Sequence, residues 1–179
     1  MMKLKCLGRI SACMAVLMAM LLAAGCQKSG NSSEESANAV LNQFLSGTVQ
    51  DADEFENQYA EIAFAETGDE TEMISVTGMD DYFQKQFGEI MTADCIADLM
   101  ADRSIIAPMK LAQQLDKDII AQDIQLTAKS GEDNAYDFST QLVTSDDKQP
   151  VGTAEGYVKM QSDNSNWKAV SMNIKIKIN

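Results

Sequence analysis

The sequence predicts an α+β fold, in which N-terminal helices pack on one face of a curved antiparallel sheet of about four strands. Two patterns lead to this prediction. Between residues 37 and 101, apolar side chains recur every three or four positions, as they do along the buried face of a helix. From about Ile119 onward, apolar and polar residues alternate, and turn sequences rich in Ser, Asp, Asn and Gly divide the region.

The first helix is signalled at its start and along its length. Ser32 and Glu35 have the spacing of a capping box. The apolar residues that follow at helical spacing are Ala37, Val40, Leu41, Phe44 and Leu45. Gly47 is the expected C-cap of this helix. A second short helix is expected to begin near Asp51 or Asp53, because Asp is a good N-cap residue.

The middle of the chain is predicted to hold one long helical region with a break. Met73–Val76 is a candidate short strand before it. The helical region runs from about Asp80 to Ala101, and Thr92 is a candidate N-cap that would divide it. Pro108 follows in an expected loop or short helical turn.

The alternating region predicts four strands joined by short turns. They cover about Ile119–Lys129, Tyr136–Val143, Val151–Gln161 and Trp167–Ile178. In the last strand the residues expected on the buried face are Val170, Met172, Ile174, Ile176 and Ile178. Strands that follow one another at this spacing form an antiparallel meander with one buried face.

The composition excludes several classes of function. The chain has 27 acidic and 14 basic residues and a formal net charge of -13, which argues against a protein that binds the phosphate backbone of nucleic acid. It contains no His, so a Ser-His-Asp triad, a Cys-His pair and a His-bearing zinc site cannot form within it. We therefore expect no catalytic residue, no metal site and no cofactor.

Residues 1–26 are organised like an export signal. The positive n-region consists of Lys3, Lys5 and Arg9. The apolar stretch from Ile10 to Ala24 has 15 residues, which is too short to span a bilayer comfortably. It runs into Leu22-Ala23-Ala24-Gly25-Cys26, which resembles the lipobox of bacterial lipoproteins. The resemblance implies cleavage between Gly25 and Cys26 and diacylation of the Cys26 sulfur. A membrane-spanning anchor, or a secretory peptide with an accidental Cys, is the alternative.

This resemblance implies three parts of the chain and a location. Residues 1–25 would be the signal peptide, residues 26–35 a flexible polar tether, and residues 36–179 the α+β domain. The protein would be held on the extracytoplasmic face of the cell membrane by the lipid on Cys26. Cys95 would then have no disulfide partner, and without a His to activate it we expect a buried, unreactive thiol.

The domain resembles the NTF2-like (cystatin-like) superfamily of cone-shaped α+β proteins. Three features carry the resemblance. They are the opening helix pair Ala37–Tyr59 with Met73–Val76 after it, the segment from Tyr82-Phe83 through Met91-Thr92 to Leu99–Arg103, and the meander with Gly156-Tyr157-Val158 and Trp167–Val170. The resemblance implies a cone between sheet and helices. Many such members are envelope lipoproteins without an assigned activity, whereas the enzymes on this fold use a carboxylate or a His inside the cone, sometimes with a Tyr.

Two functions follow as expectations. The first is a non-catalytic binding or interaction module of the cell envelope, which takes a small apolar ligand or an envelope protein partner. The alternative is a small enzyme of the isomerase or dehydratase type, in which Asp98 or Glu89 would point into the cone beside a Tyr. The residues expected to line a pocket are Tyr59, Tyr82, Phe83, Phe87, Phe138, Tyr157 and Trp167.

Overall fold

The structure is a computed structural model that describes residues 32–63, 77–163 and 166–179, without the side chains of residues 58–63 and 77. The expected signal peptide, most of the expected tether and the expected strand Met73–Val76 lie outside the described residues. The described residues belong to one compact unit, Asn31–Asn179.

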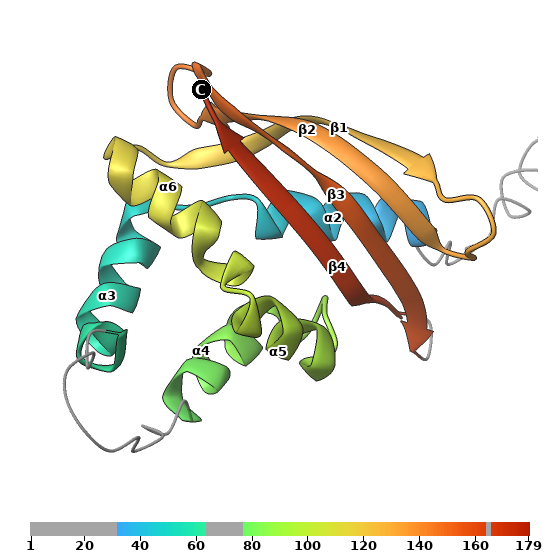
Figure 1. The fold of residues 1–179 in the computed structure, drawn as a ribbon, viewed down its shortest axis with the longest axis horizontal. Coiled ribbons are helices and arrows are strands. Elements are labelled where there is room, and N and C mark those ends of the chain that lie inside the picture. Colours follow the sequence, from blue (N-terminus) through green and yellow to red (C-terminus); the bar gives the residue numbers. More distant parts are fainter. Residues whose placement is uncertain (1–31, 64–76, 164–165) are drawn as a thin grey trace, which may run out of the picture. The chain divides into compact units, whose positions relative to one another are not determined.

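The described helices come first along the chain and the strands last, which confirms the predicted α+β class (Figure 1). The helices are α2 (Ser33–Phe44), α3 (Val49–Ala63), α4 (Thr77–Phe87), α5 (Ala93–Ala101), the 3-10 turn η1 (Ser104–Ile106) and α6 (Ala107–Leu115). The strands are β1 (Ile119–Ala128), β2 (Ala135–Thr144), β3 (Pro150–Asp163) and β4 (Asn166–Ile178). They form one antiparallel sheet in the order β1-β2-β3-β4, the predicted meander.

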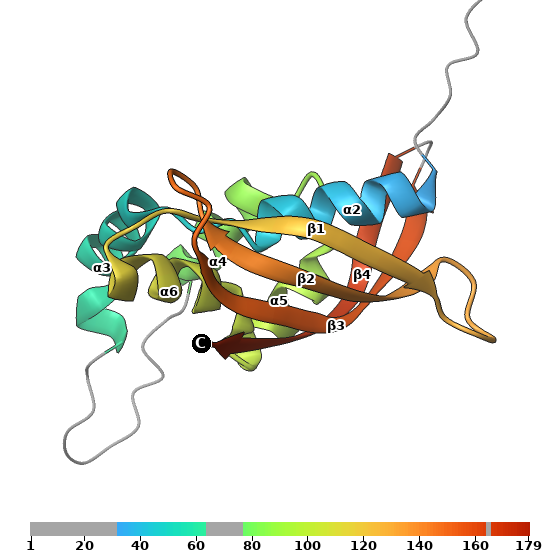
Figure 2. The ribbon, with the colours of Figure 1, turned by 90° about the horizontal axis from the view of Figure 1, so that it is seen from above.

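The sheet curves around α2, which contacts β1, β3 and β4 (Figures 1 and 2). Helix α5 packs on β4, and α3 packs on α6. The helices therefore cover the concave face of the sheet, and the other face carries the exposed residues of the strands.

The start of α2 confirms the predicted capping box. The Ser32 hydroxyl accepts a hydrogen bond from the Glu35 backbone N–H at 3.2 Å, and the Glu35 carboxylate accepts one from the Ser32 N–H at 3.0 Å. Because this reciprocal cap satisfies two free N–H groups, the helix already begins at Ser33. Residues 33–35, which were expected to belong to the tether, are thus helical.

Two predictions about the link between α2 and α3 are wrong. Gly47 is not the C-cap of α2, because Leu45 takes that position in a right-handed conformation. Gly47 instead forms an antiparallel bridge with Ile119. Helix α3 begins at Val49 and not near Asp51 or Asp53. The Thr48 hydroxyl accepts from the Asp51 N–H at 2.9 Å and so caps the helix earlier.

The break predicted at Thr92 is confirmed, and one helix was missed. The Thr92 hydroxyl accepts from the Cys95 N–H at 3.3 Å and caps α5. Helix α6 lies where the sequence suggested only a loop or a short turn. Pro108 sits in its first turn, where the missing N–H of proline has no helical partner to lose.

Two β-bulges change which residues face the helices. In β1 the register shifts between Gln122 and Gln125, where Asp123 has a φ of 57°. In β4 Lys159 pairs with Ser171 and Met160 with Ala169, which leaves Val170 as the extra residue. Ala169, at 0% exposure, therefore takes the buried position that alternation had assigned to Val170.

Side chains fill the space between the helices and the sheet. The largest that are fully buried include Phe44, Phe83, Leu41, Leu45, Met91, Ile96, Leu99, Ile119 and Leu142. Phe83 is the centre of an aromatic group, with ring centroids 5.6 Å from Phe55, 5.1 Å from Tyr82 and 6.3 Å from Phe87. Contacts between these rings stabilise the helical side of the core.

Candidate functional site

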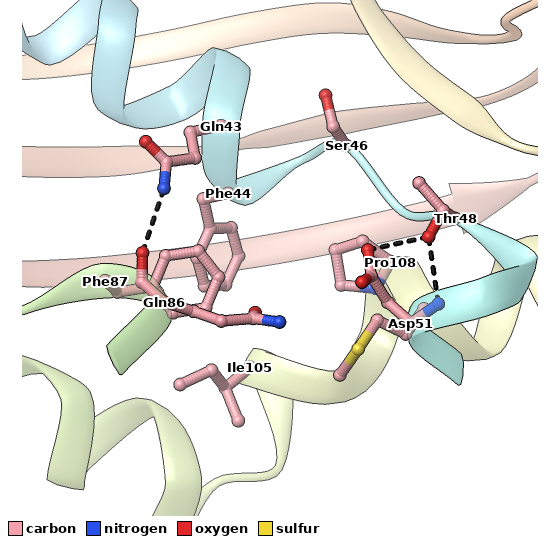
Figure 3. Close-up of a pocket in the computed structure, with 10 residues that line it drawn as sticks. Gln43, Phe44, Ser46, Thr48, Asp51, Gln86, Phe87, Ile105 and Pro108 are labelled. Carbon is pink, nitrogen blue, oxygen red and sulfur yellow. Dashed lines mark hydrogen bonds between the residues drawn. The ribbon is translucent and has the colours of Figure 1, made fainter. Parts of the chain in front are cut away.

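A pocket of about 220 Å³ opens where four helical segments meet beside the link from α2 to α3 (Figure 3). The end of α2, the start of α3, the end of α4, and η1 with the first turn of α6 all contribute to it. The residues that line the pocket are Gln43, Phe44, Ser46, Thr48, Asp51, Gln86, Phe87, Ile105, Pro108 and Met109.

The floor of the pocket is apolar and firmly packed. Phe44, Phe87, Ile105 and Met109 are all buried members of the hydrophobic core. The rings of Phe44 and Phe87 lie 5.7 Å apart. A ligand that reaches the floor would exchange water for contact with these apolar surfaces.

The rim of the pocket is polar. The Gln43 amide donates to the Gln86 backbone oxygen at 2.9 Å and so ties α2 to α4. The Thr48 hydroxyl donates to the Asp51 carboxylate at 2.6 Å while it accepts from the Asp51 N–H. Of the described lining residues, only Asp51 has a formal charge, so the pocket favours a ligand that is cationic or that donates a hydrogen bond.

The wall beside Thr48 is fixed by a close approach of two backbones. Gly47 exchanges two backbone hydrogen bonds with Ile119, of 3.1 and 2.8 Å. A Cβ at Gly47 would lie 2.4 Å from the Pro108 carbonyl oxygen. The link from α2 to α3 can therefore pass against α6 only because residue 47 has no side chain.

The volume limits what the pocket can hold. An apolar cavity of about 150 Å³ is known to accept benzene, and typical drug-sized ligands need roughly 300 Å³ or more. A compound with a single ring or a short alkyl chain, and one donor group, matches 220 Å³. In the part of the chain that is described, no three His, Cys, Asp or Glu residues cluster closely enough to hold a metal ion.

The structure brings only some of the sequence-predicted lining residues near this pocket. Phe87 lines it. Phe83 and Phe138 are buried in the core, at 0% and 4% exposure. Tyr82 is half-buried, and its hydroxyl accepts from the Gln86 side chain at 2.8 Å.

The remaining predicted lining residues lie elsewhere. Tyr157 points from β3 to the face of the sheet away from the helices, where its hydroxyl donates to the Ser171 hydroxyl at 2.7 Å. The Lys129 ammonium lies 4.7 Å from the centre of the same ring. Trp167 is half-buried at the start of β4, and the side chain of Tyr59 is outside the described residues. The seven predicted residues do not form one site.

Asp98, Glu89 and Cys95, which the sequence singled out as candidate catalytic or reactive groups, do not line this pocket. Asp98 and Glu89 are exposed. Cys95 is fully buried in α5, as predicted. Burial, and then the negative charge of Asp98, raises the pKa of the Cys95 thiol to about 12. The thiol therefore stays protonated at neutral pH and is a poor nucleophile.

Most lining residues could not be found from the sequence. They come from short pieces of separate helices, and no spacing links Gln43 to Gln86 or to Met109. Phe87 was expected in a pocket lining, and Thr48 carries a local signal, because Thr is a preferred N-cap residue. The Pro108 side of the pocket belongs to the helix that the sequence did not predict.

Comparisons with known proteins add no assignment: no family model, no curated protein and no solved structure matches the chain. Among the residues that the structure describes, none of the helices has the length and apolarity needed to cross a membrane.

Proposed function

We propose that the protein is a lipid-anchored lipoprotein on the extracytoplasmic face of the cell membrane, and that its NTF2-like domain acts by binding and not by catalysis. The observation that carries the anchor is the run Leu22-Ala23-Ala24-Gly25-Cys26 after a basic and then an apolar segment. A diacylglyceryl group on Cys26 supplies two acyl chains, which is what stable anchoring needs.

The start of α2 supports a short connection between the lipid and the domain. Six residues, 27–32, lie between Cys26 and the first residue of α2. Fully extended, they reach roughly 20 Å. The proposed anchor would thus hold the domain within about one domain diameter of the bilayer, where it can meet other envelope components.

The pocket supports a binding role for the domain. It has an apolar floor, a polar rim and one carboxylate, Asp51. The groups that the enzyme alternative needs inside the cone are both exposed, Asp98 on α5 and Glu89 in the turn that follows α4. We therefore propose a ligand of one ring or a short alkyl chain with a cationic or hydroxyl donor.

Membrane fractionation tests the anchor. The full chain is expressed in a bacterium, and membranes are washed with high salt and alkaline carbonate. Wild-type protein should stay with the membranes, whereas Cys26→Ser should appear in the soluble fraction or accumulate as the longer precursor. Cys95→Ser is the matched control and should behave like the wild type. A Cys26→Ser protein of normal processed size that remains on the membranes would contradict the proposal.

Ligand titration tests the pocket. Benzylamine is the probe for a single ring with a cationic donor, and toluene is its uncharged counterpart. Benzylamine should raise the midpoint of thermal unfolding more than toluene does, and Asp51→Asn should remove the difference. Equal shifts in the wild type and in Asp51→Asn would exclude this ligand class for the pocket.

A further inference from the structure

Strand β1 forms one edge of the sheet, and only its first residue is paired on the outer side among the described residues. In the part of the chain that the structure describes, the strand order β1-β2-β3-β4 leaves the outer side of β1 without a neighbouring strand. Gly47 pairs there with Ile119 through two backbone hydrogen bonds. The outer edge of β1 thus already pairs with an antiparallel segment at Ile119, and the rest of β1 extends past this pair.

The hydrogen bonds between β1 and β2 show which backbone groups of β1 face this open edge. The Lys129 N–H donates to the Ala135 oxygen across the β1–β2 pair at 2.8 Å. In an antiparallel ladder, alternate residues turn their backbone groups to opposite sides. The N–H and C=O groups of Leu126 and Ala128 therefore point away from β2, toward the open edge. Such groups are a template for an added strand.

A groove lies beside this edge, between β1 and the first turn of α2. It has a volume of about 620 Å³. The residues that line it are Ser32, Glu34, Glu35, Asn38, Ile124, Gln125 and Leu126. Ile124 and Leu126 are half-buried and offer apolar contact, whereas Glu34 and Glu35 are exposed. The groove can therefore receive the side chains of an extended chain that pairs with β1.

The charge of the groove determines the kind of partner. Glu34 and Glu35 lie in its lining, and Asp123 is exposed directly before Ile124. Among the described residues, no Lys or Arg lines the groove. Lys129, at the end of the strand, is held by Glu132 at 2.7 Å. A second copy of this chain would bring the same carboxylates together, so a basic partner is favoured.

The two edges of the sheet are protected differently. The start of β4 is covered by a bridge from Met91 to Ala169, and its exposed end carries Lys175 and Lys177. Edge lysines are a common device against unwanted strand pairing. Strand β1 contains no Lys, Arg or Pro. Its bulge at Asp123 lies before the segment Ile124–Ala128 and leaves that segment regular.

We propose that the edge of β1 binds an extended, basic segment of a partner protein by strand addition. The backbone of Leu126 and Ala128 would pair with the added strand, and basic side chains would lie near Glu34 and Glu35. This surface is separate from the pocket beside Thr48, and the proposal does not depend on the lipid anchor.

A peptide probe tests the proposal on the full chain, kept soluble in detergent. The probe is a fluorescein-labelled octapeptide of alternating Lys and Val. One control peptide alternates Glu and Val, and a second replaces two Val of the probe by Pro, which cannot complete a ladder. Binding is measured by fluorescence anisotropy, and hydrogen exchange with mass spectrometry locates it. Only the Lys-Val peptide should bind, and it should slow exchange in the segment 119–129.

Two matched variants distinguish the edge from general charge attraction. Gln125→Lys adds a positive charge in the groove, and Gln141→Lys adds the same charge at an exposed position of the inner strand β2. Gln125→Lys should weaken binding by about fivefold, the upper range for an exposed charge pair, and Gln141→Lys by less than about twofold.

Each other outcome would overturn the proposal. Equal weakening by both variants, or binding of the Pro-containing peptide, would show that the peptide binds by non-specific charge attraction and not by strand addition. Slowed exchange in β4 would place the site at the wrong edge. No binding of the Lys-Val peptide would exclude this class of partner. Self-association of the chain, with slowed exchange in β1 without peptide, would show that the edge pairs with a second copy.

Discussion

Gly47→Ala tests the close approach that shapes the pocket wall. The added Cβ would lie 2.4 Å from the Pro108 oxygen and 2.6 Å from its carbon. Ordinary van der Waals contact begins at 3.4 Å, so the two backbones must separate by about 1.0 Å. Neither atom belongs to a side chain that could rotate away. The strain falls on the bridge to Ile119 and on the first turn of α6.

Overpacking of this kind costs about 1–3 kcal/mol. For a domain of this size each kcal/mol lowers the midpoint of thermal unfolding by roughly 2–4 °C, so the expected fall is about 2–12 °C. Circular dichroism or scanning calorimetry of the full chain measures it. Ligand binding in the pocket should weaken as well, because Ser46 and Thr48 flank residue 47.

Gly47→Asn separates the close approach from the C-cap that the sequence suggested. A left-handed cap also accepts Asn, whereas the close approach to Pro108 rejects any side chain. We therefore expect Gly47→Asn to be at least as unstable as Gly47→Ala. Gly131→Ala is the control. Gly131 has a φ of 82° and open space around it, so this substitution should lower stability only through the unfavourable φ of Ala and not through a steric clash. A stable Gly47→Asn protein would refute the reasoning.

Three further outcomes are expected. Thr92→Ala should lower the free energy of unfolding in denaturant by about 1 kcal/mol, because it removes the cap of α5. Thr92→Ser should restore most of this stability. An unchanged stability of Thr92→Ala would mean that the cap does not stabilise α5. Cys95 should resist iodoacetamide at pH 8 in the folded protein and react once the chain is unfolded, since burial raises the pKa of its thiol to about 12; rapid labelling of the folded chain would contradict this. The Thr144 hydroxyl, and then the Lys117 ammonium, hold the pKa of the Asp147 carboxyl well below its usual range. This stabilisation is present above the unfolded-state pKa of about 3.9 and is lost as the pH falls toward the lower folded pKa. Asp147→Asn should therefore lower the free energy of unfolding at pH 7 and make it depend less on pH in the acid range. An unchanged acid dependence would show that the Asp147 carboxyl contributes nothing.

The strands and the first helix could be predicted because their signals are local. Alternation of apolar and polar residues over about 4–8 positions is enough to predict a strand with one buried face. The capping box at Ser32 and the cap at Thr92 are likewise complete within four residues. Each of these features needs no knowledge of the rest of the chain.

The bulges, the missed helix and the pocket depend on tertiary contacts. A bulge moves one residue out of the pairing pattern, so alternation assigned Val170 to a buried position that Ala169 occupies. Pro108 has the same sequence signal in a loop as in the first turn of a helix. The role of Gly47 depends on Pro108, which lies on another helix. No local pattern contains that information.

Intact-mass spectrometry of the protein extracted from membranes tests the central claim most directly. The proposed lipoprotein predicts a mature chain that starts at Cys26, lacks residues 1–25 and carries the added mass of a diacylglyceryl group on that residue. Fragmentation should place the added mass on the first residue. A chain that retains Met1, or one that begins at another residue without lipid, would contradict the claim.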